Sequence, residues 1–126
     1  MADDLVQSLI VVVSTDDEIM LFQNSASAES YLEPIDVKRG EYKAAYDANG
    51  RAFDITVGIQ RRRFLGIFPF VFERVELVRK FESPKQAELI AALRRFLSTL
   101  GIAQETIATA TLAELLGRAR EVVFQK

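Results

Sequence analysis

The 126-residue sequence contains no cysteine and no histidine. Without cysteine, the chain cannot form disulfides, thiolate nucleophiles, iron–sulfur clusters or Cys-ligated zinc sites. Without histidine, it lacks the side chain best suited to proton transfer near pH 7 and the commonest metal ligand. The chain also has no Gly-rich phosphate loop and no G-x-S-x-G motif. We therefore expect no catalytic residue, no metal site and no cofactor.

Long hydrophobic runs are missing as well. The two longest, Leu9–Val13 and 64–72, are far shorter than the roughly 20 residues needed to span a bilayer. The first run follows Asp3 and Asp4, where a secretory leader would carry basic residues. Hydrophobic residues make up 49% of the chain and charged residues 27%, which is typical of a soluble globular protein. We expect a cytoplasmic protein with one domain over residues 1–126 and no transmembrane segment.

The net charge of −2 conceals a polarity along the chain. Residues 1–50 contain ten acids and three bases, a net charge of −7, and the remaining residues contain thirteen bases and eight acids, a net charge of +5. Such asymmetry can indicate a charged partner. In one compact domain the two sets can instead interleave and form ion pairs, which is the interpretation that we favour.

Strand patterns dominate residues 5–81. The β-branched run Leu9–Val13 is typical of a strand covered on both faces, and Glu18–Phe22 follows it as the second arm of a hairpin. A second hairpin joins Glu41–Tyr46 to Arg51–Ile59 through the turn residues 47–50. In its first strand, alternation predicts that the two tyrosines and Ala44 share a face.

A short helix is predicted between these hairpins, over Ala26–Leu32. Asn24 or Ser25 can cap its N-terminus, because a side-chain oxygen at that position accepts a bond from a free backbone N–H. Pro34 should end it.

Residues 67–81 also favour strand, but their apolar positions change phase. The phenylalanines at even positions share one parity, whereas Val75 and Leu77 share the other. The segment therefore needs a bulge, a break into two strands or burial on both faces. We expect a bend near Glu73 and Arg74.

The pattern becomes helical over residues 83–124. Ser83 can act as an N-cap with Pro84 in the first turn, and Gly101 can end the helix. The helix carries one apolar stripe, made of Leu89, Ile90, Leu93, Phe96, Leu97 and Leu100.

A second C-terminal helix should begin after Thr111, which can form a reciprocal capping box with Glu114, and should end near Glu121. The predicted fold is α+β. It has an antiparallel sheet of four to five strands with one short N-terminal helix and two C-terminal helices packed on it.

Arg61, Arg62 and Arg63 form the strongest basic cluster, followed by a Phe-rich run. The cluster could bind phosphate, nucleic acid or an anionic surface. A solvated loop that pairs with the acidic half is the more economical explanation, and a pI of about 5.2 disfavours nucleic acid.

The stretch from Leu21 to Arg51 contains a YLEPIDV…GEY…YDANGR pattern. This pattern resembles a small family of uncharacterised bacterial proteins, some of which are similar to immunity proteins of toxin systems. The resemblance spans about 30 residues and contains no catalytic signature. It implies a small intracellular protein that neutralises a toxin by occluding it.

An inhibitor of this kind needs a complementary surface rather than catalytic chemistry, and acidic side chains could steer it toward a basic toxin. Turns and an exposed helix face would present the candidate partner-binding residues. These are Asp16, Asp17, Glu29, Glu33, Asp36 and Asp47. For Asp36 and Asp47 a purely structural role in turns is an alternative explanation.

The leading interpretation is therefore a non-enzymatic cytoplasmic protein-binding domain, of which an immunity-type toxin inhibitor is the specific case. One alternative is a ligand- or anionic-surface-binding module that uses Arg61–Arg63 and the Phe-rich segment. A lesser alternative is an enzyme that uses carboxylates and arginines. Self-association stays open.

Overall fold

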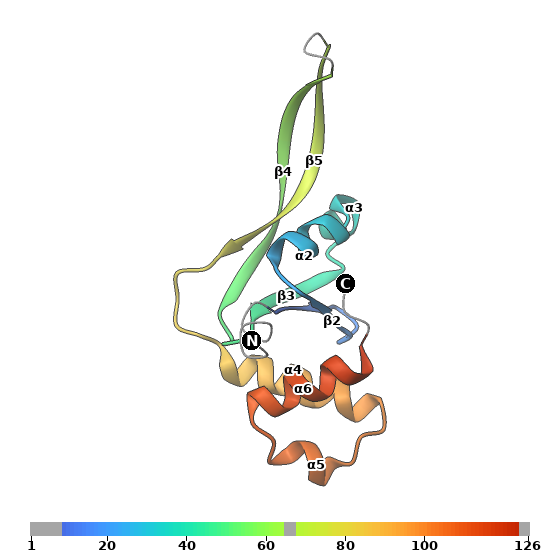
Figure 1. The fold of residues 1–126 in the computed structure, drawn as a ribbon, viewed down its shortest axis with the longest axis vertical. Helices are drawn as coiled ribbons and strands as arrows, with labels where there is room; N and C mark the ends of the chain where they lie inside the picture. The colour runs from blue at the N-terminus through green and yellow to red at the C-terminus, as the bar shows by residue number, and fades with distance from the viewer. Residues whose placement is uncertain (1–8, 65–67, 124–126) are drawn as a thin grey trace.

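The computed structural model describes residues 9–64 and 68–123, including all of their side chains except those of 62–64 and 68–70. One five-stranded antiparallel sheet, in the order β2-β1-β3-β4-β5, forms the centre of the molecule (Figure 1). Its strands are β1 (Ile10–Ser14), β2 (Ile19–Phe22), β3 (Tyr42–Asp47), β4 (Ala52–Phe64) and β5 (Phe68–Arg79). The predicted α+β class is confirmed.

Helices cover both faces of this sheet. They are α2 (Ser25–Tyr31), α3 (Pro34–Lys38), α4 (Gln86–Thr99), α5 (Gln104–Ala108) and α6 (Leu112–Val122). In Figure 1, α4, α5 and α6 lie below the sheet, and α2 and α3 lie above it beside β4 and β5. The described residues include no helix that is long and apolar enough to cross a membrane.

Strand β1 occupies the interior of the sheet and is buried on both faces, as its sequence predicts. Val11 and Val13 pack into one core cluster with α4 and α6, whereas Ile10 and Val12 pack into a second cluster with α2. Its antiparallel pairing with β2 confirms the first predicted hairpin.

The region after β2 contains two short helices where the sequence predicted one. Asn24 caps α2 by accepting a bond from the Ser27 N–H at 2.8 Å, which decides between the two predicted caps. Helix α2 ends at Tyr31, so the predicted end at Leu32 is nearly correct. Pro34 then begins α3, because its missing N–H costs nothing in the first turn.

A β-bulge in β3 changes the face on which Tyr42 lies. Val13 is opposite Ala44 but Ser14 is opposite Tyr42, so Lys43 is the extra residue. Tyr42 therefore packs with the second cluster, whereas Tyr46 packs with the first. The prediction that both tyrosines share a face is wrong.

Strands β4 and β5 form a long hairpin that projects from the body (Figure 1). Their ladder runs from Phe53↔Arg79 to Phe64↔Phe68 without a register shift. Of the three predicted alternatives, a bulge and a break are therefore wrong, and the change of apolar phase places apolar side chains on both faces of the hairpin. The expected bend near Glu73 and Arg74 stays a prediction.

The start of α4 differs from the prediction, and its end agrees with it. Ser83 is not the N-cap; the cap position is Lys85, whose N–H donates to the Gly50 carbonyl at 2.7 Å and so ties the helix to the β3–β4 turn. At the C-terminus, Gly101 has a φ of 85°. Ile102 N–H donates to the Leu97 carbonyl at 3.2 Å, as in a Schellman motif.

The predicted capping box of α6 is confirmed, with Thr111 and Glu114 bonding reciprocally. The helix ends at Val122, one residue beyond the prediction, and Phe124 lies outside the described residues. Helix α5 was not predicted, because its five residues carry too short an apolar pattern; its buried Ile107 nevertheless completes the first core cluster.

Candidate functional site

The acidic and basic parts of the sequence interleave in the fold, which supports the favoured interpretation of the charge polarity. Among the described residues, three of the six ion pairs join an acid of residues 1–50 to an arginine from the rest of the chain. They are Arg74–Glu29, Arg79–Asp47 and Arg95–Asp17. Three of the candidate partner-binding residues thus make internal contacts.

Asp17 joins the β1–β2 turn to β3 and α4. It pairs with Lys43, and its Oδ1 accepts a bond from Arg95 Nη1 at 3.0 Å. The bond from Lys43 is the main reason that the pKa of the Asp17 carboxyl is lowered. Its φ of 64° is tolerated by aspartate better than by most residues.

Glu29 supports the hairpin from the side of α2. Its Oε2 accepts a bond from the Leu77 N–H at 2.8 Å, and Arg74 Nη2 lies 3.7 Å from its Oε1. Leu77 is in β5, at the edge of the sheet, so Glu29 satisfies an edge N–H that would otherwise need water. Glu29 and Glu33 do not share a helix face, because α2 ends between them.

Asp47 organises the β3–β4 turn. It is 8% exposed, and its Oδ1 accepts bonds from the N–H groups of Asn49 and Arg51, each at 2.9 Å. With these contacts Asp47 has the structural role in a turn that its sequence position suggested as an alternative to partner binding.

The other three candidates, Asp16, Glu33 and Asp36, line one open pocket of about 690 Å³. We call it the acidic pocket. Glu18 and Glu41 add two further carboxylates, and none of the described lysines or arginines lines it. Its other lining residues are Ser14, Thr15, Met20, Tyr31 and Tyr42.

Three separate segments build the acidic pocket: the β1–β2 turn, the α2–α3 junction and the start of β3. The bulge at Lys43 is what turns Tyr42 toward it. The Tyr42 hydroxyl donates to Asp36 Oδ2 at 3.5 Å. Burial is the main reason that the pKa of Tyr42 is raised to about 12, and the negative charges of Asp36 and Glu41 add to this effect.

The carboxylates of the acidic pocket do not form a metal centre. Within the described parts of the chain, no group of three Asp or Glu side chains is arranged to hold a metal ion. Their chemistry is that of dispersed negative charge, which suits a basic ligand with several cationic groups.

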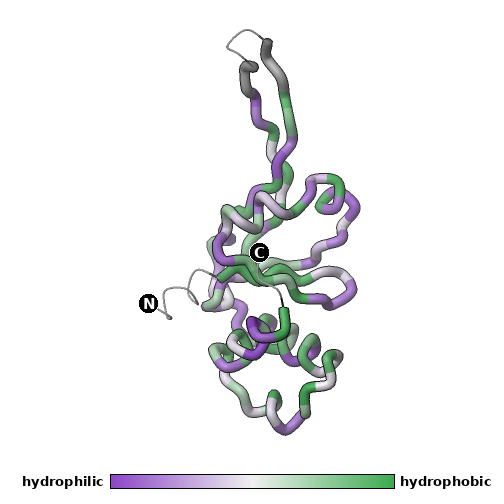
Figure 2. Tube along the Cα trace, turned by 45° about the vertical axis from the view of Figure 1, so that its right-hand side comes forward, coloured by the Kyte–Doolittle hydropathy of each residue, from purple (hydrophilic) through white to green (hydrophobic). Residues whose placement is uncertain are grey.

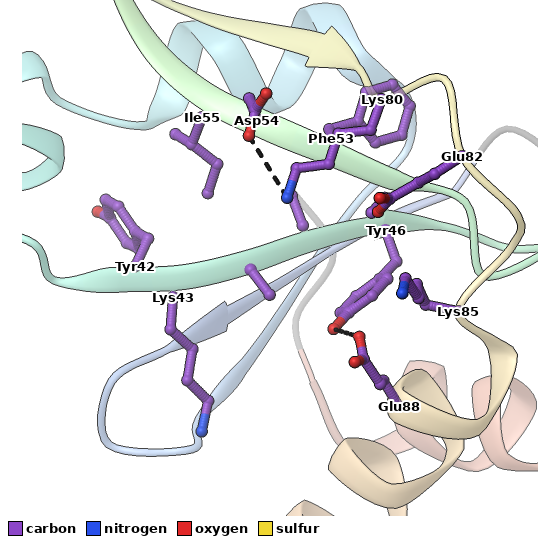
Figure 3. Close-up of a pocket in the computed structure, with 13 residues that line it drawn as sticks. Tyr42, Lys43, Tyr46, Phe53, Asp54, Ile55, Lys80, Glu82, Lys85 and Glu88 are labelled. Atoms are coloured by element: carbon purple, nitrogen blue, oxygen red, sulfur yellow. Dashed lines mark hydrogen bonds and ion pairs between the residues drawn. The ribbon is translucent and has the colours of Figure 1, made fainter.

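A second pocket, of about 540 Å³, lies where β3 and β4 diverge (Figure 3). The Tyr46 hydroxyl donates to Glu88 Oε2 at 3.3 Å, and Lys80 Nζ lies 3.5 Å from Asp54 Oδ1. Three lysines and three acids line this pocket, so its charges offset one another. It has no single preferred ligand charge.

Arg61, Arg62 and Arg63 lie in the outer part of β4, on the projecting hairpin rather than in a solvated loop. Arg61 is exposed. None of the three arginines is therefore among the described residues that line the acidic pocket. The alternative that they bind an anionic surface stays a prediction.

Comparison with family models, curated proteins and solved structures gave no significant match. The fold defines an α+β protein, and the acidic pocket is its candidate binding site. The resemblance to immunity proteins stays a prediction.

The sequence did not indicate Glu18 or Glu41 as parts of the site. Their contribution depends on the turn after β1 and on the bulge in β3, which bring the two segments to one pocket. The turn belongs to the predicted first hairpin, whereas the bulge has no signal in the residue pattern.

Proposed function

We propose that this protein is a non-enzymatic binding domain that holds a basic segment of a partner protein in the acidic pocket. The observation that carries the proposal is that five carboxylates from three segments line one pocket, and that no lysine or arginine in the described part of the chain lines it. A cleft lined by charge of one sign focuses the electric field and attracts ligands of the opposite sign. Lysine or arginine side chains of a partner would supply the missing counter-charge.

The resemblance to immunity proteins supports a basic toxin as the first partner class to test. An inhibitor that occludes a nuclease can pair with the cations that normally bind the nucleic-acid backbone. Such pairing requires surface charge at defined positions and no chemistry from the inhibitor itself.

A direct test uses a fluorescent deca-lysine peptide as the probe, with a deca-glutamate peptide as the reference. The variant Asp16→Lys/Glu33→Lys reverses two exposed charges at the pocket. Glu105→Lys/Glu121→Lys is the matched control, because both glutamates are exposed and lie on α5 and α6.

We expect the pocket variant to bind deca-lysine at least about tenfold more weakly at low salt, since each reversal replaces attraction with repulsion of about 1 kcal/mol. The control variant should lose much less. Equal losses in the two variants would show that only the net charge matters and would refute the proposal.

A further inference from the structure

Among the described residues, the β4 edge that faces β3 has no neighbouring strand along most of its length. The ladder between β3 and β4 ends at Ala45↔Phe53, whereas the ladder between β4 and β5 continues to Phe64. The outer edge of β5 is different, because Glu29 of α2 accepts a bond from the Leu77 N–H there. In this part of the chain, β4 is therefore paired on one side only beyond Phe53.

Two hydrogen bonds fix the backbone directions along this open edge. The Arg51 carbonyl accepts from the Asp47 N–H on the β3 side, and the Ala52 carbonyl accepts from the Lys80 N–H on the β5 side. In an antiparallel ladder without bulges, alternate residues point the same way. The odd-numbered residues from 55 to 61 thus point their N–H and C=O groups out of the hairpin. Within the described ranges, these outward groups have no bonding partner.

An open edge of this kind favours pairing with another strand. Natural sheets block such pairing with charged residues, proline and bulges on the edge, and residues 55–60 contain none of these. A two-stranded hairpin is by itself only marginally stable in water, and this one projects beyond the helices (Figure 2). A third strand would satisfy the edge and stabilise the hairpin.

The side chains along the edge indicate which kind of strand fits it. Val57 and Ile59 share one face of the hairpin, and Ile59 is 68% exposed. Arg61 follows on the same face. Its neighbour on β5 is Val71, and within the described part of the chain Arg61 forms no ion pair. The edge is thus apolar in its inner part, and in its outer part it carries an arginine without an acidic counterpart.

We propose that this edge binds an extended segment of a partner protein, which is apolar at alternate positions and acidic at its N-terminal end. The segment pairs antiparallel with β4, so that apolar residues lie opposite Val57 and Ile59 and an acidic residue lies opposite Arg61. In this mode of recognition main-chain hydrogen bonds give affinity and the alternate side chains give specificity. The proposal uses no residue of the acidic pocket and does not depend on the proposed function.

The added strand fits without displacing β3. It covers residues 56–62, so its inner end lies three positions beyond Phe53, where the pairing with β3 stops. At that end lies the second pocket, which is lined by Asp54 and Ile55 of β4 (Figure 3). Its volume of about 540 Å³ gives the partner chain room to leave the edge before it reaches the β3–β4 ladder.

A fluorescent peptide of sequence TETVTVT is the probe, and its binding is followed by fluorescence anisotropy. In the proposed register its glutamate lies opposite Arg61 and its valines lie opposite Ile59 and Val57. We expect saturable binding with a dissociation constant below about 1 mM. The same peptide with an N-methyl group on the valine opposite Ile59 is the matched control, because that N–H would donate to β4. It should bind at least about tenfold more weakly.

Two variants of the protein test the position of the added strand. Arg61→Glu should bind TETVTVT at least about tenfold more weakly, and TKTVTVT should bind this variant better than the wild type. Arg118→Glu is the matched control, because Arg118 is an exposed arginine on α6; it should bind TETVTVT like the wild type. Ile59→Pro removes an outward N–H that does not bond to β5, so it should abolish binding while far-UV circular dichroism stays unchanged.

Absence of saturable wild-type binding up to about 1 mM would overturn the proposal. Equal binding of the N-methylated peptide would also overturn it, by showing attraction between charges without strand pairing. Binding of phosphatidylserine vesicles without binding of TETVTVT would assign Arg61 to a lipid surface instead. Deca-lysine binding by Ile59→Pro reports separately on the acidic pocket and should equal that of the wild type.

Discussion

The contacts of Asp47 predict a large and specific effect of its removal. In Asp47→Ala the N–H groups of Asn49 and Arg51 both lose a charged acceptor at 2.9 Å. A hydrogen bond to a charged group contributes about 1.5–3 kcal/mol. Asn49 and Arg51 are exposed, so water replaces part of each bond, and we expect a loss of about 3 kcal/mol. The Arg79 contact, at 3.9 Å, adds little.

Asp47→Asn keeps an oxygen acceptor and loses only the charge, so it should cost about 1 kcal/mol. Urea unfolding followed by far-UV circular dichroism measures both values. Glu73→Ala is the control, because within the described part of the chain Glu73 makes only a half-exposed ion pair, with Lys38; this variant should cost less than about 0.5 kcal/mol. If Asp47→Ala cost no more than Glu73→Ala, Asp47 would not organise the turn and would again be a candidate for partner binding.

Three further predictions concern the pocket and the hairpin. The absorbance titration of Tyr42 should have its midpoint near pH 12, and Asp36→Asn should move it toward 10; an unchanged midpoint would mean that the pocket carries little negative potential. Because the folded chain holds this proton more tightly, the associated stability is present below pH 10 and is lost between pH 10 and about 12, a loss that Tyr42→Phe should abolish. Glu29→Ala should cost about 2 kcal/mol by leaving the Leu77 N–H without its acceptor, against less than about 0.5 kcal/mol for Glu33→Ala, and equal costs would contradict the contact. The anionic-surface alternative predicts cosedimentation with phosphatidylserine vesicles that Arg61→Glu reduces, and absence of wild-type binding would eliminate it.

Local patterns predicted most of the secondary structure because the relevant signals lie within a few residues of one another. The capping box at Thr111, the cap at Asn24 and the helix end at Gly101 each depend on a side chain or φ preference at one position. The burial of β1 on both faces follows from its unbroken β-branched run.

The errors arose where distant contacts decide the local structure. Ser83 is not the N-cap of α4, because Lys85 takes that position and donates its N–H to the Gly50 carbonyl in the β3–β4 turn. Tyr42 changed face because β1 imposes a bulge on β3.

Distant contacts also decide which candidate acids make internal ion pairs and which line the acidic pocket. Nothing in the local sequence distinguishes Glu29, which bonds to β5, from Glu33, which lines the acidic pocket. The distinction depends on the break between α2 and α3 and on the position of the hairpin.

The central claim, that the acidic pocket binds a basic segment, is tested most directly by following backbone amide NMR shifts of the labelled protein during titration with deca-lysine. The account predicts saturable changes at 14–18, 33–36 and 41–42, the segments that line the pocket. Changes confined to other surfaces, such as α5 and α6, would contradict it.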